Sequence, residues 1–367
     1  MHVGYSANFQ NPADALPDSE VWGSELELID ELESLGFESL WTVEHHFTDY
    51  IMCPDPVQFL TYHAGRTERI LLGTGVIVLP WHDPMRIAEQ ITMLDNLSGG
   101  RLILGLGRGI ARVEYDGFRV DMNTSRERFI EYAEMIIEGL ERGYLEHDGE
   151  FVQQPRRDIR PRPEHSFRGR TYAAAVSPES MPIMAKLGVG LLVIPQKPWD
   201  IVEQDFAVYN EIYEQENGCA APPPLSGGSC FVDESADRAE EMAHRYMGAY
   251  YASIMQHYEF GDDPHRGVKG YEFYTNITKY ISRHGAEGAA DDFVKLMPWG
   301  TPEQVIEKFE FIKNTINAAG FMPGFSYGGM PYSEVERSVR LFADKVLPEL
   351  KSWDAPPLQV PALASAA

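Results

Sequence analysis

The chain has 367 residues, of which 44% are hydrophobic, so it can bury a sizeable core. Its 56 acidic and 31 basic residues give a formal net charge of −25, which argues against nucleic acid and anionic membranes as partners. The three cysteines are too scattered for a disulfide framework, and no apolar run reaches the roughly 18 residues of a membrane span. The N-terminus lacks a signal peptide, so we expect a soluble, cytoplasmic protein.

Short apolar segments alternate with amphipathic ones along the whole chain, which favours a parallel sheet covered by helices. Strands are predicted at 39–43, 70–78, 101–106, 171–176, 189–194, up to about 232 and at 320–325. Helices are predicted at 26–35, 84–97, 179–187, 199–216, 236–255, 303–317 and 334–350, and one more begins at a capping box over 124–127. About eight strands, each followed by a helix, favour a (β/α)8 barrel over a doubly wound sheet.

Three segments interrupt this alternation. Residues 144–168 are polar and rich in arginine and proline, and we expect a surface excursion there. Residues 257–298 are rich in glycine, aspartate and aromatic residues without a clean period, which is typical of a lid placed before the last unit. Residues 1–355 are predicted to form one domain, and 356–367 a disordered tail.

Several familiar motifs can be tested and set aside. A dinucleotide-binding G-x-G-x-x-G would need glycine where Ile110 stands. The stretch from Gly324 to Gly328 fits the nucleophile elbow G-x-S-x-G around Ser326, but no histidine follows His284 to complete a triad. Because neighbouring side chains of a strand point to opposite faces, His45 and His46 are not expected to share a metal ion.

Two features point to a phosphate or a flat ligand. Gly105, Gly107 and Gly109 surround Arg108 at a strand end, where bare backbone and a guanidinium can approach a ligand closely. A tight turn with a surface arginine explains the same residues equally well. Residues 177–180, Ser-Pro-Glu-Ser, follow a strand and open a helix, as in an anion site, although a plain helix cap is the commoner explanation.

Taken together, these segments resemble the bacterial luciferase-like family of flavin-dependent monooxygenases. The stretch 41–48, with Glu44-His45-His46-Phe47, is similar to the luciferase α subunit. Residues 78–84, 94–101 and 118–126 look like the family's third and fourth barrel units and the stretch that follows them. The resemblance covers roughly residues 1 to 350, and the joint set is far more specific than any one motif.

The resemblance implies an enzyme that binds FMNH2 and uses O2, through a flavin C4a-hydroperoxide, to oxygenate a small hydrophobic aldehyde, ketone, alkene or alkane. His45 would be the catalytic histidine beside the flavin, and Arg108 would hold the phosphate. Gly75-Val76 stands where the family has a non-prolyl cis peptide under the flavin ring. The remaining residues of the implied flavin site are Gly107, Ser177, Pro178, Glu179 and Ser180.

The chain also departs from the α subunit, since Gly107 replaces a reactive cysteine, and the family's catalytic aspartate aligns with either Glu114 or Asp116. No NAD(P)H module is visible, so a separate flavin reductase is expected to supply FMNH2, and relatives imply a homodimer. Two alternatives remain open. One is an F420-dependent oxidoreductase that transfers hydride on the same barrel, and the other is a non-catalytic flavin-binding barrel.

Overall fold

Nine parallel strands form one closed sheet in the computed structural model, which describes residues 1–175, 177–261 and 265–364. They are β1 (His2–Ala7), β2 (Ser39–Thr42), β3 (Leu71–Thr74), β4 (Ile77–Val78), β5 (Leu102–Gly107), β8 (Thr171–Ala174), β9 (Gly190–Val193), β10 (Leu225–Ser229) and β13 (Gly320–Gly324). Both β3 and β4 pair with β5, so they are successive pieces of one barrel position. The predicted (β/α)8 barrel is therefore confirmed.

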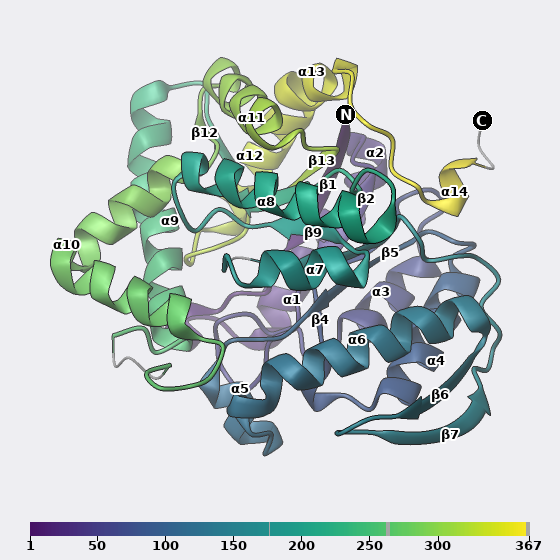
Figure 1. The fold of residues 1–367 in the computed structure, drawn as a ribbon. Coiled ribbons are helices and arrows are strands. Elements are labelled where there is room, and N and C mark those ends of the chain that lie inside the picture. The colour runs from purple at the N-terminus through teal and green to yellow at the C-terminus, as the bar shows by residue number, and fades with distance from the viewer. Residues whose placement is uncertain (176, 262–264, 365–367) are drawn as a thin grey trace.

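Helices surround this barrel on its outside (Figure 1). They are α1 (Asp18–Ile29), α2 (Leu32–Leu35), α3 (Pro56–Ala64), α4 (Pro84–Leu97), α5 (Arg112–Phe118), α6 (Ser125–Arg142), α7 (Ser180–Leu187), α8 (Trp199–Asn217), α9 (Ala236–His257), α10 (Glu272–Leu296), α11 (Pro302–Ile316), α12 (Tyr332–Leu341), α13 (Leu347–Ser352) and α14 (Pro361–Ala364). In α6 the buried residues Phe129, Ala133, Ile136 and Leu140 recur at helical spacing, and this stripe faces the core. No helix in the described part of the chain has the length and apolar character needed to cross a bilayer.

Large and small side chains alternate inside the barrel. Trp41 on β2 is almost fully buried, and a Cβ added at Gly73 on the next strand would fall 2.2 Å from its ring. Glycine at 73 therefore makes room for the indole. At the opposite end from the site described below, Val360 packs against the same interior cluster and is only 3% exposed.

The strand predicted over 70–78 is divided in the structure. β3 ends at Thr74 and β4 begins at Ile77, and the peptide bond between Gly75 and Val76 is cis. The cis bond lies where the luciferase resemblance places one. The cavity described below is lined by both residues.

The capping box predicted at the start of α6 is wrong. Thr124 has an α-helical ψ of −1° and makes no side-chain cap. Its hydroxyl instead donates to the carbonyl of Asp121 at 2.8 Å, because a short helical turn, η3 (Met122–Thr124), precedes the helix. The residue pattern of a capping box is present, but the chain enters the helix from a turn rather than from extended backbone.

Residues 144–168 form a surface excursion, as predicted, built on the antiparallel pair β6 (Tyr144–Asp148) and β7 (Gln153–Asp158) beside α6 (Figure 1). A second small sheet pairs β11 (Phe231–Val232) with β12 (Trp299–Gly300). The predicted lid segment begins at the end of α9 and contains α10, which packs along α9 on the flank of the barrel. The segment lacks a clean hydrophobic period because α10 lies on this flank, where few of its residues are buried.

The tail differs from its prediction. We predicted disorder over 356–367, whereas residues 356–364 follow a defined path that includes α14. Val360, Leu358 and Ala362 contact the interior cluster, so the tail covers that end of the barrel. Residues 365–367 lie outside the described part of the chain.

Candidate active site

A cavity of about 220 Å³ lies at the carboxyl ends of the barrel strands. The last residues of six strands reach it, namely Thr42, Val78, Gly107, Ala174, Ser229 and Gly324. The ends of α9 and α10 complete its wall through residues such as Ile254 and Phe293. This is the end of a (β/α)8 barrel at which catalytic residues are found.

Much of the cavity wall is apolar. Six of its residues are Ile51, Met184, Ile194, Ile254, Phe293 and Met297, which come from separate parts of the barrel and the lid segment. Such a wall favours hydrophobic ligands and limits access of water.

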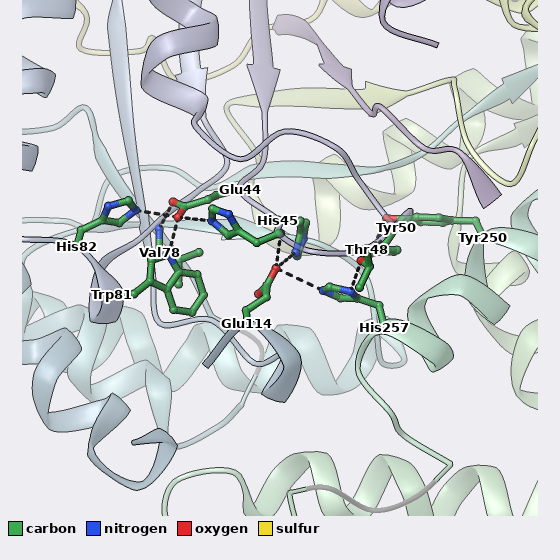
Figure 2. A network of polar contacts seen from close by, with 11 residues as sticks. Glu44, His45, Thr48, Tyr50, Val78, Trp81, His82, Glu114, Tyr250 and His257 are labelled. Atoms are coloured by element: carbon green, nitrogen blue, oxygen red, sulfur yellow. Dashed lines mark hydrogen bonds and ion pairs between the residues drawn. The ribbon is translucent and has the colours of Figure 1, made fainter. Parts of the chain in front are cut away.

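His45 lies on this cavity and is held by a buried carboxylate. It follows β2 in a loop, where its backbone N–H donates to the carbonyl of Cys53 at 3.1 Å. Its Nδ1 lies 3.0 Å from Oε1 of Glu114 in α5, and the backbone N–H of His46 donates to the same oxygen at 2.9 Å (Figure 2). This contact fixes the orientation of the ring and favours the tautomer that carries its proton on Nδ1.

Of the two acidic residues that the sequence left open, Glu114 is the one that contacts His45. Glu114 is 1% exposed and contacts His45, whereas Asp116 is exposed. Burial alone would raise the pKa of Glu114, but the neighbouring charge of His45 and the close imidazoles of His257 and His45 lower it to about 2. Glu114 is therefore a carboxylate at neutral pH.

A second buried carboxylate, Glu44, holds the other side of the loop. Its Oε1 accepts from the indole N–H of Trp81 at 2.6 Å and contacts the imidazoles of His82 at 2.8 Å and His46 at 3.1 Å (Figure 2). Its Oε2 accepts from the backbone N–H of Val78 at 2.8 Å. Burial opposes ionisation, yet the hydrogen bonds from both histidines keep the pKa of Glu44 below its usual value. The adjacent residues His45 and His46 thus contact different carboxylates, those of Glu114 and Glu44.

His257, the last residue of α9, belongs to the site although no motif in the sequence pointed to it. Its Nε2 lies 3.5 Å from Oε1 of Glu114, and its Nδ1 lies 2.9 Å from the hydroxyl of Thr48. Burial lowers the pKa of His257 despite the nearby carboxylate. No spacing in the sequence connects residue 257 with residues 45 and 114, so only the fold could reveal this contact.

Arg108 is joined by a second arginine that the sequence analysis did not single out. Nη1 of Arg108 and Nη2 of Arg126 donate to the same acceptor, the carbonyl of Gly270, at 2.8 and 2.9 Å. The guanidinium of Arg108 also lies 3.9 Å from the ring centre of Tyr271. Both arginines line the cavity. Two guanidinium groups directed at one point form a place for an anionic group.

The serines predicted at the phosphate site lie at the start of α7. Ser180 lines the cavity, and its hydroxyl is 2.8 Å from that of Ser177, which is buried behind it. Pro178 and Glu179 are exposed at the turn between them. Ser180 and Arg108 thus reach the same cavity, from the start of α7 and from the residue after β5.

The residues predicted to lie under a flat ring, Gly75, Val76 and Gly107, also line the cavity. A Cβ at residue 107 would fall 2.2 Å from Cγ2 of Val76, so the side chain of Val76 packs directly against the backbone at the end of β5. By contrast, Ser326 of the nucleophile-elbow pattern is 5% exposed, and its hydroxyl donates to the carbonyl of Asn8 at 3.1 Å. This hydrogen bond gives Ser326 a structural role.

The fold and the site define a (β/α)8-barrel enzyme with a histidine–carboxylate pair and an arginine pair around one apolar cavity. The profile of the family described as "Luciferase-like monooxygenase" matches residues 1–316. The chain therefore belongs to the luciferase-like monooxygenase family, and its class of activity is that of a flavin-dependent monooxygenase. The resemblance stated from the sequence motifs is confirmed.

Two curated relatives illustrate the range of this family. The alkanal monooxygenase alpha chain of Photorhabdus luminescens is 27% identical over 330 residues, which cover 87% of this chain and 89% of the relative. The oxygenase component of the flavin-dependent trigonelline monooxygenase of Acinetobacter baylyi is 27% identical over 262 residues, covering 68% and 72%.

Solved structures share the fold at lower identity. Monooxygenase RslO1 from Streptomyces bottropensis has a TM-score of 0.78 at 24% identity, covering 95% of this chain and all of that one. The oxygenating constituent of 3,6-diketocamphane monooxygenase from Pseudomonas putida, solved with FMN, has a TM-score of 0.72 at 15% identity over 95% and 99%. The F420-dependent tetrahydromethanopterin reductase of Methanopyrus kandleri has a TM-score of 0.65 at 21% identity, again over 95% and 99%.

A flavin phosphate fits the residues that this chain presents. Arg108 and Arg126 supply two guanidinium groups whose nitrogen atoms converge on one point, and Ser180 adds a hydroxyl to the same cavity. The side chain of Val76, packed against Gly107, gives the cavity an apolar surface of the kind that a flat ring can contact. We therefore treat the cavity as suited to a phosphorylated flavin.

Proposed function

We propose that this protein is the oxygenase component of a two-component system that uses FMNH2 and O2 to oxygenate a small hydrophobic substrate, an aldehyde, ketone, alkene or alkane. One observation supports this most directly. A single apolar cavity joins an arginine pair suited to the flavin phosphate, Arg108 and Arg126, to a histidine held by a buried carboxylate, His45 and Glu114.

Each side chain of the site has a distinct part in this proposal. Arg108, Arg126 and Ser180 bind the phosphate, with Ser177 positioning Ser180, while Pro178 and Glu179 form the turn that presents their backbone. Gly75, Val76 and Gly107 support the ring from one side. When bound, reduced FMN supplies the electrons that activate O2, and the protein holds and shields it.

His45 is the proton donor and acceptor of the site. Glu114, ionised at neutral pH, stabilises the proton on Nδ1 of His45, so Nε2 is left as the nitrogen that exchanges a proton with the reacting groups. The apolar wall and the lid segment keep water from the reaction. The role of Glu114 is thus to orient and tune His45.

The electrons come from outside the chain. A relative bears the name of an oxygenase component, and we propose likewise that a separate NAD(P)H:flavin reductase delivers FMNH2 to this protein. We also propose a cytoplasmic homodimer, by analogy with the family. Activity with NADH and FMN in the absence of any reductase would contradict the two-component arrangement.

The proposal is tested by giving the protein photoreduced FMN and a C10 aldehyde, alkene or ketone in the presence of ¹⁸O2. We expect incorporation of one ¹⁸O atom into the product, detected by mass spectrometry, and a fall of about 10²–10⁴-fold in the rate of His45→Gln. His147→Gln, on the outer hairpin, is the matched control and should retain the wild-type rate. Failure of every substrate class, or equal rates in His45→Gln, would contradict the proposal.

An F420-dependent oxidoreductase is the alternative, and the barrel shared with the Methanopyrus kandleri reductase favours it. Such an enzyme transfers hydride and does not consume O2. Tight binding of reduced F420 together with substrate reduction under anaerobic conditions would support this alternative over oxygenation. Tight FMN binding with neither activity would instead indicate a non-catalytic flavin-binding barrel.

A further inference from the structure

Three side chains with metal-ligating atoms meet beside the cavity. Nδ1 of His45, Oε1 of Glu114 and Nε2 of His257 all lie within 4.8 Å of one another (Figure 2). They come from the loop after β2, from α5 and from the end of α9. His45 and His46 were not expected to share an ion because they are adjacent, but in this cluster His45 meets residues that are distant in the chain.

One atom of this cluster lacks a partner. Nε2 of His257 is buried in a side chain that is only 1% exposed, and it makes no hydrogen bond, since the oxygen of Glu114 beside it is 3.5 Å away. Nδ1 of the same ring is already engaged by the hydroxyl of Thr48 at 2.9 Å. A buried nitrogen without a partner is unfavourable, and such atoms commonly mark a bound water or ion. This nitrogen is directed at a carboxylate oxygen 3.5 Å away.

The carboxylate can accept an ion at that point. Oε1 of Glu114 accepts from the backbone N–H of His46 at 2.9 Å and lies 3.0 Å from Nδ1 of His45 and 3.5 Å from Nε2 of His257. A metal ion that displaces the proton on Nδ1 of His45 keeps this oxygen as a ligand between the two imidazoles. Glu114 is 1% exposed, so its negative charge is not neutralised by bulk water and attracts a cation.

We propose that His45, Glu114 and His257 form a binding site for a divalent transition-metal ion of the Zn²⁺ type. Bonds of about 2.1 Å at tetrahedral angles place neighbouring ligand atoms about 3.4 Å apart. The observed separations of 3.0 Å and 3.5 Å between Glu114 and the two histidines lie on either side of that value. Two imidazoles and one carboxylate suit zinc and its neighbours rather than Mg²⁺ or Ca²⁺.

Thr48 supports the proposed metal site, and an ion bound there affects the chemistry of His45. Thr48 fixes the tautomer and orientation of His257, as a hydrogen-bonded partner of a metal-bound histidine does. An ion on Nδ1 of His45 replaces the proton shared with Glu114 and connects the start of the lid segment to the barrel. The site is therefore inhibitory toward any reaction that uses His45. Binding of the ion itself does not depend on the proposed function.

The test is a titration of the flavin-free, chelator-treated full-length protein with Co²⁺, followed by visible absorption, and with Zn²⁺, followed by calorimetry. We expect one ion per chain and the visible absorption of low-coordinate cobalt. Loss of a partner outside the ligand set already weakens metal binding about 10- to 100-fold, so His257→Gln and Glu114→Gln should each weaken it by at least about 100-fold.

His147→Gln is the matched control. Nε2 of His147 lies 3.4 Å from Oε1 of Glu131 in a similar histidine–carboxylate pair, and no third ligand completes that pair in the described residues. This variant should bind Co²⁺ as the wild type does. Circular dichroism checks folding, and His45→Gln removes another ligand should His257→Gln fail to fold. Absence of the cobalt absorption, or undiminished binding in the folded ligand variants, overturns the proposal.

Discussion

Cγ2 of Val76 lies 2.2 Å from the position that a Cβ on residue 107 would occupy. Both residues line the cavity, one just after the cis peptide bond and the other at the end of β5. Any side chain at 107 therefore competes with Val76 for the same space. The luciferase α subunit, which this chain resembles, carries a reactive cysteine at that position, and here Val76 occupies the room that such a side chain needs.

Gly107→Ala should destabilise the protein by about 1–3 kcal/mol, because the new methyl group overlaps Val76 in a packed region. Val76→Ala removes the opposing atoms, so the double variant should recover much of that loss. Denaturant unfolding of the wild type, both single variants and the double variant measures the coupling. Additive effects of the two substitutions would show that the two side chains do not compete.

Glu114→Gln should lower the oxygenation rate by at least about 10-fold, within the contribution that general acid–base catalysis makes. The amide can present N–H rather than oxygen to Nδ1 of His45 and so disturbs the tautomer that the carboxylate favours. Asp116→Asn is the matched control, since Asp116 is exposed, and it should keep the wild-type rate. Product formation with saturating reduced FMN is the measurement, and equal rates for both variants would contradict the role of Glu114.

Arg126→Ala should weaken FMN binding about 10- to 100-fold, since a hydrogen bond to a charged group contributes about 1.5–3 kcal/mol. Riboflavin lacks the phosphate, so its affinity should not change. Fluorescence titration with both ligands separates a phosphate contact from a general disturbance of the cavity. A parallel loss of riboflavin binding would contradict the assignment of Arg126 to the phosphate.

Glu25→Gln should stabilise the protein more at pH 8 than at pH 5. Glu25 is fully buried, with the hydroxyl of Tyr5 2.8 Å from Oε1 and that of Tyr332 3.2 Å from Oε2. Burial outweighs the effect of the neighbouring hydroxyls of Ser326, Tyr5 and Tyr332 and raises the pKa of Glu25 to about 7.

The sign follows from proton linkage. Between the unfolded pKa near 4.5 and the folded pKa near 7, the native state holds a proton that the unfolded state has lost, so this group's contribution to stability falls as pH rises through that window. The loss amounts to roughly 3 kcal/mol. Chemical denaturation of wild type and Glu25→Gln across pH 5–8 measures the difference. A constant difference across that range would show that Glu25 does not titrate there.

The alternation of strands and helices was readable from the sequence, because the apolar period of each element depends on its own neighbours. The family resemblance rests on stretches of consecutive residues such as the one around His45, and it implied the cis bond at Gly75-Val76 that the structure contains. The local pattern gave a wrong prediction where the conformation of the preceding residues decided the structure. The residues of a capping box occur at Thr124, yet a preceding turn leaves Thr124 bonded to Asp121.

Only the tertiary structure decided the rest of the site. Glu114, rather than Asp116, faces His45 because of the direction in which α5 turns that side chain toward the barrel. His257 and Gly270 reach the site from the lid segment, far along the chain from Arg108 and Arg126. Such contacts arise when a barrel brings the ends of its strands and the following loops to one rim, and no sequence spacing records which side chains then meet.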